Sequence, residues 1–401
     1  MSTLMQYVNE AALLSEVRLF SRNVLRAHAA RIDQEDQIPD EIVSGIAKRR
    51  LFVLDRCNDA SSAFSDHQRW TLLLSVIEEI ARVSPPIAKL VLDQNLGQLE
   101  MLRAFAKLAV WNEFGPAIQN GDMQLAFLLT EPRSGSDLDK FDCCVEHDNA
   151  RGGFVVRGSK DWITGANDRR LFLLVARSSA NPQAFGLFLV DKQIAKDTIT
   201  IGEKKQKLGL RGLSEHRVDF HNTFIPDEHV LLQPNKSTIR QIMKHYNVKR
   251  CGQVGIALGI AKSAFSISYK YLTQRYPTAN GRPVFPTAEF AFAEMYASIV
   301  ATETLKDWAV AKLANGDETG TPTSVAKLSA TECALSVANQ AMQLCGAVGM
   351  SGALPLERLM RDARMLTVGC GTSELQKLTI AKNLPKLLAH PDFECDWPSI
   401  P

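Results

Sequence analysis

The sequence has little excess charge and no long hydrophobic segment. Its 401 residues include 46 Lys and Arg against 44 Asp and Glu, a formal net charge of +2, which argues against a general nucleic-acid-binding protein. Charged residues interrupt the apolar runs well short of the roughly 20 residues that a membrane span needs. The first residues, MSTLMQYVNEAALLSEVR, lack the basic segment and apolar core of a signal peptide. We therefore expect a cytoplasmic protein with no nucleic-acid or membrane partner.

The cysteines lack the spacing of a metal site. The sequence contains no C-x-x-C pair and no H-x-x-x-H pair, and zinc sites are built from such groups. We therefore predict that no metal is bound. In a long chain without a secretory signal, most cysteines are expected to be reduced core thiols. They are Cys57, Cys143, Cys144, Cys251, Cys333, Cys345, Cys370 and Cys395.

The pattern of apolar residues divides the chain into three parts. Residues 1–117 show helical periodicity, in segments that include 70–82 and 87–102. Residues 118–236 contain short, often alternating apolar runs, which predict strands at 123–129, 152–158, 170–177, 185–191 and 216–225. Residues 237–401 contain long Ala-rich helices, predicted at 239–275, 288–315 and 325–348. We expect an α+β protein that is mainly helical: an N-terminal helical domain, a middle β-barrel-like domain and a C-terminal four-helix bundle.

One segment of the C-terminal part has the form of a ligand-facing corner. MLTVGCGTSELQKLTIAKNL, residues 365–384, ends an apolar stretch with Gly369-Cys370-Gly371 and then opens a polar helix at Thr372. Glycines allow a tight turn, and the unpaired N–H groups of a helix start attract anions. The pattern predicts that Cys370 faces a ligand.

Two polar segments follow predicted strands in the β-rich part. LLTEPRSGSD, residues 128–137, offers several hydroxyls beside the flexible Gly135, and its alternative interpretation is a polar hairpin turn. GSKDWITGAND, residues 158–168, places the indole of Trp162 beside a hydroxyl at a strand end. That arrangement suits the binding of a flat conjugated ring. The alternative interpretation is that Trp162 is a core residue at the edge of a sheet.

In their order and spacing these segments resemble the motifs of the acyl-CoA dehydrogenase superfamily of flavoproteins. The resemblance covers about residues 10–390 and rests on TEPRSGSD, KDWITGAND, KLGLRG…VDFHNTFIP, QLCGAVG, LMRDAR and GTSELQKLTIAKNL. It implies the three-part fold predicted above, with FAD between the β domain and the bundle. It also implies a homo-oligomer, a dimer or tetramer, in which a neighbouring subunit completes the FAD site. The implied partners are an acyl-CoA or acyl-carrier-protein thioester and a flavin electron acceptor.

The resemblance also implies roles for individual residues. The residues expected to contact FAD are Phe127, Leu129, Thr130, Gly135, Ser136, Trp162, Ile163, Thr164, Arg275, Gln343, Gly346, Thr372, Ser373 and Glu374. Among them, Arg275 matches an arginine that reaches the FAD pyrophosphate from a second subunit. The residues expected on the substrate side are Ser136, Asn247, Arg250 and Gly371.

The chain departs from the family pattern after Arg275. The segment RYPTANGRPVFP has Thr278, Ala279 and Pro286 where the family usually has Phe, Gly and an adenine-binding Gln. This departure predicts weaker or rebuilt FAD binding across the subunit interface.

The second departure is at Cys370. Most dehydrogenases of the family have a glutamate directly before Gly-Thr-Ser, which removes the α-proton of the thioester while hydride leaves the β-carbon for the flavin. A cysteine is shorter, has an ordinary pKa of about 8.5, and needs electropositive help to form a thiolate. Some relatives place the glutamate on the first bundle helix instead, and counting back from Arg275 that position is Lys249. Neither position holds a carboxylate.

We therefore name Cys370 and Lys249 as the catalytic candidates and keep three interpretations open. In the first, the family reaction is retained, with Cys370 or a displaced group as the base. In the second, a biosynthetic flavoprotein reduces, eliminates or cyclises a thioester-bound substrate, with Lys249 lowering the pKa of the thiol. In the third, the protein is not catalytic, Cys370 is an apolar filler, and Lys249 is a solvated charge or a phosphate contact.

Overall fold

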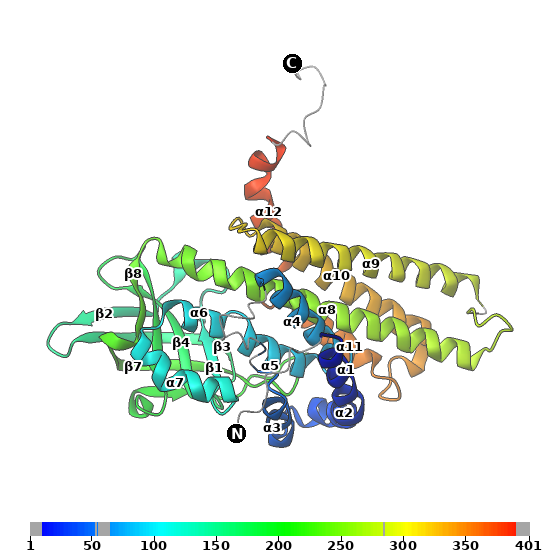
Figure 1. Cartoon of the computed structure of the whole chain (residues 1–401), viewed down its shortest axis with the longest axis horizontal. Helices are drawn as coiled ribbons and strands as arrows, with labels where there is room; N and C mark the ends of the chain where they lie inside the picture. The colour runs from blue at the N-terminus through cyan, green and yellow to red at the C-terminus, as the bar shows by residue number, and fades with distance from the viewer. Residues whose placement is uncertain (1–9, 53, 55–64, 284, 390–401) are drawn as a thin grey trace, which may run out of the picture.

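The computed structural model describes residues 10–52, 54, 65–283 and 285–389. Along the sequence, helices come first and last, and the strands of an eight-stranded sheet come between them (Figure 1). The sheet forms one end of the molecule, and the helices α8, α9 and α10 extend side by side toward the other end. This order of helix, sheet and bundle agrees with the sequence prediction.

Helices before the sheet pack on the bundle through apolar faces. They are α1 (Glu10–Phe20), α2 (Arg26–Glu35), α3 (Asp40–Lys48), α4 (Asp66–Ala81), α5 (Pro85–Asn95), α6 (Gln98–Phe105) and α7 (Leu108–Asn120), with a π-helical turn (Ser21–Leu25) between α1 and α2. The single helix predicted over 87–102 is wrong, because Gly97 has a φ of 89° and separates α5 from α6. Glycine adopts this conformation without the steric cost that a Cβ would bring.

The sheet is built around strands that are buried on both faces. Its strands are β1 (Leu125–Leu128), β2 (Cys144–Asp148), β3 (Gly153–Thr164), β4 (Leu171–Ser178), β5 (Phe185–Asp191), β6 (Ile199–Ile201), β7 (Glu215–Pro226) and β8 (Val230–Asn235). Their order is β6-β7-β3-β2-β4-β5-β8, and β1 pairs in parallel with β4. The apolar β4 and β5 were predictable, whereas the half-exposed β2 and the short β6 lack a strong apolar pattern.

The C-terminal part consists of α8 (Thr238–Arg275), α9 (Pro286–Ala314), α10 (Thr321–Leu344), α11 (Leu356–Leu366) and α12 (Ser373–Leu388). Small residues let α8 approach the N-terminal helices: a Cβ at Gly252 would lie 2.1 Å from Leu92 Cδ1 of α5. The close approach places polar side chains of α5 and α8 next to each other. None of the described helices combines the length and the apolar character that crossing a membrane requires.

Two apolar cores hold these elements together. The larger one joins the N-terminal helices, one face of the sheet and the bundle, and the smaller one lies on the other face of the sheet. Neighbouring residues of one strand alternate between them, with Leu173 in the larger core and Leu174 in the smaller. Of the six described cysteines, all of them free thiols, four are buried as predicted, and Cys57 and Cys395 lie outside the described residues. The buried four are Cys143, Cys251, Cys333 and Cys345.

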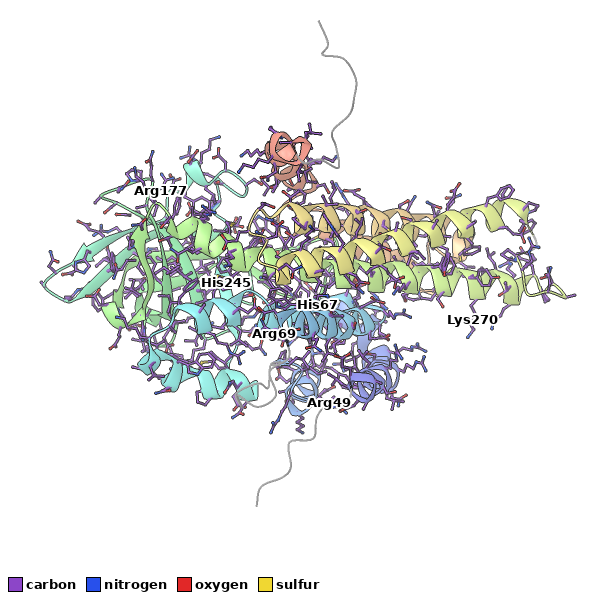
Figure 2. The ribbon with its side chains drawn as sticks, turned by 45° about the horizontal axis from the view of Figure 1, so that its top comes forward. Arg49, His67, Arg69, Arg177, His245 and Lys270 are labelled. Carbon is purple, nitrogen blue, oxygen red and sulfur yellow. The ribbon has the colours of Figure 1, made fainter. Side chains whose placement is uncertain are left out.

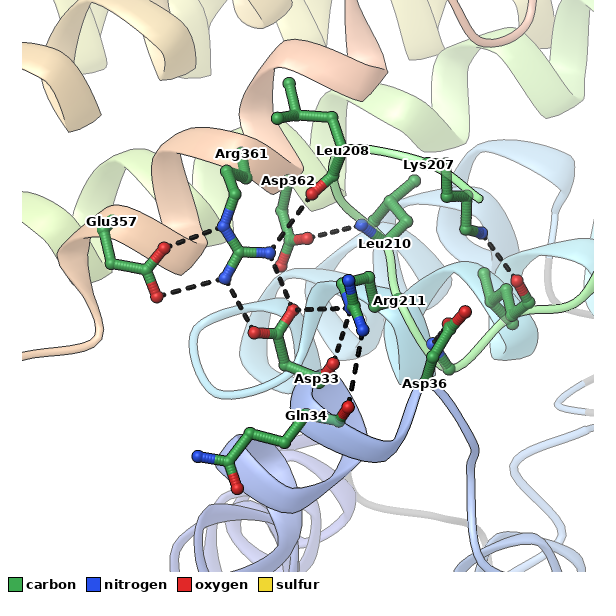
Figure 3. A network of polar contacts seen from close by, with 12 residues as sticks. Asp33, Gln34, Asp36, Lys207, Leu208, Leu210, Arg211, Glu357, Arg361 and Asp362 are labelled. Carbon is green, nitrogen blue, oxygen red and sulfur yellow. Dashed lines mark hydrogen bonds and ion pairs between the residues drawn. The ribbon is translucent and has the colours of Figure 1, made fainter. Parts of the chain in front are cut away.

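A polar network joins the three parts of the chain at one point (Figure 3). Arg361 of α11 donates to both carboxylate oxygens of Asp33 of α2, at 2.8 and 2.7 Å, and to Glu357. Arg211, in the loop before β7, donates to the Asp33 carbonyl at 2.6 Å. The Leu210 N–H of the same loop donates to Asp362 of α11 at 2.5 Å. The glycine-rich KLGLRG segment is therefore a junction between the sheet and two helical regions.

We expect Asp362→Asn to stabilise the protein more at pH 8 than at pH 5. Burial raises the pKa of Asp362 from 3.8 to about 7, and its second carboxylate oxygen has no hydrogen-bond partner among the described residues. The protonated carboxyl therefore contributes stability that is fully present below the unfolded-state pKa of about 3.9 and is lost as the pH rises toward 7. Asparagine keeps an acceptor for Leu210 and does not ionise. Melting temperatures of both proteins at the two pH values measure this, and a difference that does not grow with pH contradicts it.

Candidate active site

The Gly369-Cys370-Gly371 corner lies between α11 and α12. Cys370 has a φ of 57° and Gly371 a φ of 95°, so two successive residues adopt the left-handed region and reverse the chain. Thr372 then caps α12, and its hydroxyl accepts the Leu375 N–H at 3.2 Å. In the described structure the N–H groups of Cys370 and Gly371 donate to no protein acceptor. The corner therefore presents two unpaired backbone donors, as its sequence predicted.

Side chains from three helices fix the backbone of this corner. Lys327 of α10 donates to the carbonyls of Gly371 and Thr367 at 2.8 and 3.2 Å. Arg250 of α8 donates to the Cys370 carbonyl at 3.3 Å, and Gln376 of α12 donates to that of Gly371 at 2.9 Å. Burial lowers the pKa of Lys327 to about 8. These contacts compensate for the cost of a left-handed cysteine.

The Cys370 thiol points toward polar groups of α8. Gln253 Nε2 lies 3.3 Å from Sγ. Burial, together with the neighbouring Cys370, raises the pKa of Tyr246. Three cations, Lys249, Arg250 and Lys327, interact electrostatically with the thiol. In the part of the chain that the structure describes, no carboxylate forms a hydrogen bond with Cys370.

Lys249 lies in the same site but has other polar partners. Its Nζ is 3.0 Å from Asp93 Oδ1 of α5 and 3.2 Å from Gln98 Oε1 of α6. The α5–α6 break makes room for it, because a Cβ at Gly97 would lie only 3.0 Å from Lys249 Cδ. Burial lowers the pKa of Lys249, and Asp93 opposes that shift. The predicted Lys249–Cys370 pair is therefore a long-range electrostatic interaction, without a hydrogen bond between the two groups in the described structure.

The two other α8 residues expected on the substrate side bind each other. Arg250 Nη1 donates to Asn247 Oδ1 at 2.7 Å, and both side chains are buried. Arg250 also holds the Cys370 carbonyl. A direct contact with substrate stays a prediction for both residues.

The sheet contributes a second group of predicted residues. Phe127 of β1 lies against Tyr246, with ring centroids 5.8 Å apart, and Lys249 Nζ is 5.8 Å from the Phe127 ring. The carbonyl of Thr130 accepts the Asp161 N–H at 2.8 Å, so the segment after β1 lies beside β3. Trp162 follows with a φ of 58° and a side chain 48% exposed. The structure thus brings the predicted ring contacts together at one edge of the sheet, beside α8.

A buried ion pair supports this edge. Lys160 Nζ is 2.7 Å from Glu131 Oε1, with side chains 0% and 2% exposed, and 3.0 Å from the Leu129 carbonyl. Glu131 also accepts the backbone N–H groups of Asp142 and Cys143. The pair therefore fixes Leu129 and Thr130, two of the predicted ring contacts.

Other predicted FAD contacts lie far from Cys370 in this single chain. Arg275 ends α8, where it donates to the hydroxyls of Tyr271 and Tyr276 at 2.6 and 3.1 Å. At a rise of about 1.5 Å per residue, the helix from Lys249 to Arg275 is about 39 Å long. Figure 2 shows this span, with His245 near the sheet and Lys270 near the far end of the bundle. Gln343 and Gly346 are exposed, and they lie at the end of α10, which packs along α8.

The remaining predicted residues surround the corner and the loop after β1. Gly135 and Ser136 are exposed, and a Cβ at Gly135 would meet no atom within 4 Å. Ser373 is buried and donates to Glu332 at 2.5 Å, so its hydroxyl already has a partner. Glu374 is exposed at the start of α12, where its own backbone N–H and the Thr372 hydroxyl lower its pKa. Ile163 is buried and Thr164 half-buried.

Four residues of the site were not predicted from the sequence. They are Asp93, Tyr246, Gln253 and Lys327. Tyr246, Lys249, Arg250 and Gln253 recur at helical spacing just before the small and apolar stretch 254–261 of α8, and that spacing places them on one face. This polar pattern is the sequence signal that could have identified Tyr246 and Gln253 on α8.

Comparison with known proteins gives consistent matches. Residues 126–223 match the model "Acyl-CoA dehydrogenase, middle domain" and residues 239–384 match "Acyl-CoA dehydrogenase, C-terminal domain", together more than half of the chain. The chain is 27% identical over 380 residues to 3-sulfinopropanoyl-CoA desulfinase of Paraburkholderia xenovorans, covering 93% of this chain and 95% of that protein. It is 28% identical over 370 residues to the mitochondrial short-chain specific acyl-CoA dehydrogenase of Mus musculus, covering 92% and 88%.

The fold matches solved structures over nearly its whole length. Butyryl-CoA dehydrogenase from Megasphaera elsdenii superposes with a TM-score of 0.86 at 22% identity, covering 96% of this chain and 100% of that structure. The predicted fold class is thereby confirmed.

Proteins of this kind are FAD-dependent flavoproteins, and FAD is the cofactor. The residues present fit it. The half-exposed indole of Trp162 offers a flat face for the ring, and the open space at Gly135 and Gly346 lets a ligand approach the backbone. In the described structure, the unpaired N–H groups at the corner add two further donors.

Proposed function

Because this chain belongs to the acyl-CoA dehydrogenase superfamily, we propose that it is an FAD-dependent oxidoreductase of an acyl thioester in which Cys370 replaces the usual carboxylate base. The thioester is carried by CoA or by an acyl-carrier protein. Reduced flavin passes its electrons to a flavin electron acceptor.

The observation that supports an altered base is the setting of the Cys370 thiol. Gln253 Nε2 lies 3.3 Å from Sγ, and Lys249, Arg250 and Lys327 all interact electrostatically with it. Hydrogen-bond donors and cations stabilise negative charge on sulfur. In our proposal Cys370 is the base that takes the α-proton and holds it at Sγ.

The corner backbone has a second role in this proposal. The N–H groups of Cys370 and Gly371 have no protein acceptor in the described structure, and the lysine and glutamine contacts hold them in place. Fixed backbone donors stabilise the charge that develops on a carbonyl oxygen when the α-proton leaves. We assign the thioester carbonyl to these donors, with Arg250, Asn247 and Ser136 on the substrate side.

When it is bound, FAD supplies the hydride acceptor. We propose that Phe127, Leu129, Thr130 and the Trp162–Thr164 segment contact its ring, with Gly135 and Ser136 beside them. A substrate held between these residues and the corner would be shielded from water, which strengthens the electrostatic interactions in the site.

We propose that Arg275, Gln343 and Gly346 contact FAD bound to a second copy of the chain. Arg275 lies about 39 Å along α8 from Lys249, too far to serve its own site. Exposed apolar side chains on α9 and α12 support a homo-oligomer. They are Phe290, Tyr296, Val300 and Trp308 on α9, and Leu378, Leu384, Leu387 and Leu388 on α12.

A second candidate function is a diverted reaction on the same thioester. Two observations favour this diverted reaction. In the described structure no carboxylate is hydrogen-bonded to Cys370, and two relatives are named 3-sulfinopropanoyl-CoA desulfinase and 3-(aryl)acrylate reductase. In this alternative the enzyme eliminates a group or reduces an alkene instead of oxidising a saturated chain.

Anaerobic mixing of the purified flavoprotein with a panel of saturated acyl-CoA and acyl-carrier-protein thioesters tests the proposal. Loss of the flavin absorbance with at least one thioester is the expected result. A changed substrate mass without flavin reduction would favour the diverted reaction. A protein that binds no flavin and changes no thioester would be a non-catalytic member, and the proposal would be wrong.

A further inference from the structure

Lys249 belongs to a buried group of charges around Asp93, which we call the Asp93 cluster. Asp93 forms ion pairs with Lys89, with Lys249 at 3.0 Å and with Arg169 at 4.0 Å. None of these four side chains is more than 12% exposed. The cluster lies where α5, α6, α8 and the edge of the sheet meet, because Arg169 also donates to the Leu125 carbonyl of β1 at 2.9 Å.

The Asp93 cluster contains more positive than negative charge. In the described part of the chain, its three cations form ion pairs with Asp93 and with no other carboxylate. Burial lowers the pKa of both Lys249 and Arg169, which reflects the cost of holding these cations away from water. Buried charges in proteins are normally paired, so a surplus of buried cations is a feature that an anionic ligand would neutralise.

Lys249 has a donor left for such a ligand. An ammonium group carries three N–H donors, and two of them are engaged by Asp93 and Gln98. The third has no acceptor in the described structure. Lys249 Nζ lies 5.8 Å from the Phe127 ring, a proposed flavin contact, and it interacts electrostatically with Cys370. The free donor is therefore next to the site of the proposed reaction.

A second observation at the same site also indicates a missing polar partner. Gln253 is fully buried, its Nε2 contacts Cys370 Sγ, and its Oε1 has no hydrogen-bond partner within the part of the chain that the structure describes. Whichever way the amide is oriented, one of its two polar atoms stays unpaired in the protein alone. An unpaired buried amide atom costs free energy, and a polar substrate would remove that cost.

We propose that the Asp93 cluster binds an anionic group at the far end of a short acyl chain. Lys249 pairs with that group directly, and Lys89 adds positive charge behind it. The group is a monoanion that requires few hydrogen-bond donors, a carboxylate or a sulfinate. A phosphate is excluded because one free N–H donor would leave most of its oxygens unpaired. The substrate is then a thioester of a short dicarboxylic or sulfinic acid, a specificity that rests on the proposed function.

The experiment compares succinyl-CoA with butyryl-CoA, whose acyl groups have equal chain length and differ in the terminal charge. Binding to the FAD-loaded Cys370→Ala protein is measured by calorimetry, so that no reaction disturbs the titration. We expect succinyl-CoA to bind about tenfold or more tightly, because only its terminal carboxylate can pair with the Lys249 ammonium group. Adding Lys249→Met should bring the two dissociation constants close to each other.

Lys262→Met is the matched control, because Lys262 is a partly buried lysine paired with Glu78 and Glu303 on the bundle, away from Cys370. It should retain the preference. If Lys249→Met does not fold, Lys89→Met tests the same charge and should reduce the preference. Equal binding of the two thioesters, or a preference that survives both cluster substitutions, would overturn the inference and leave the proposed function intact. Binding of neither thioester would overturn both.

Discussion

Cys370→Ala should slow the anaerobic reduction of the flavin by a saturated acyl-CoA about 10²- to 10⁴-fold, the usual contribution of a general base. The substitution removes the thiol, which is the only side-chain group proposed to contact the α-proton. The neighbours that fix the corner bind backbone carbonyls of Cys370, Gly371 and Thr367, so they remain in place. Stopped-flow absorbance of the flavin measures the rate.

Cys370→Glu is the matched variant. It places a carboxylate where most dehydrogenases of the family carry one, and it should restore reduction to at least the wild-type rate. Flavin content measured on each protein separates loss of the base from loss of the cofactor. Equal rates in the wild type and Cys370→Ala would show that Cys370 is not the base, and would favour the diverted reaction.

Lys160→Met should lower the free energy of unfolding by about 3–5 kcal/mol, the cost of leaving one member of a buried ion pair unpaired. Glu131 would keep its two backbone donors and lose its cation. Because Lys160 also holds the Leu129 carbonyl, the loop after β1 should loosen and the protein should retain less FAD. Urea unfolding and the ratio of flavin to protein absorbance measure the two effects.

The double variant Lys160→Met, Glu131→Gln supplies the control. It removes both charges together, so much of the lost stability should return. If the double variant is as unstable as the single one, the lost contact of the Lys160 ammonium group with the Phe141 ring is the cause, and the ion-pair explanation is wrong.

The elements with strong local patterns were predictable from the sequence. The long helices α8, α9 and α10 follow from apolar periodicity, and β4 and β5 follow from continuous apolar runs. The corner at Cys370 was predictable for the same reason: glycines and a helix cap are local signals. The position of Trp162 at an exposed strand end also follows from its neighbours in the chain.

The contacts that give the site its chemistry depend on long-range packing. Asp93 and Lys249 meet because Gly97 breaks a helix that its apolar pattern predicts to be continuous, and because Gly252 lets α5 approach α8. Lys327 reaches the corner from a helix that ends far along the bundle. No local pattern specifies such pairs. Lys249 and Cys370 could therefore be predicted from the sequence, whereas their proximity to Asp93, Gln253 and Tyr246 could not.

The most direct test of the altered base is hydrogen exchange at the α-carbon of acetyl-CoA. This thioester has α-hydrogens and no β-carbon, so hydride transfer cannot occur and exchange reports proton removal alone. In deuterated buffer, the FAD-loaded wild type should incorporate deuterium into acetyl-CoA well above the enzyme-free rate, as followed by mass spectrometry. Cys370→Ala should not exceed that background rate. Exchange at the background rate with the wild type, or equal exchange with and without the thiol, would contradict the assignment of Cys370 as the base.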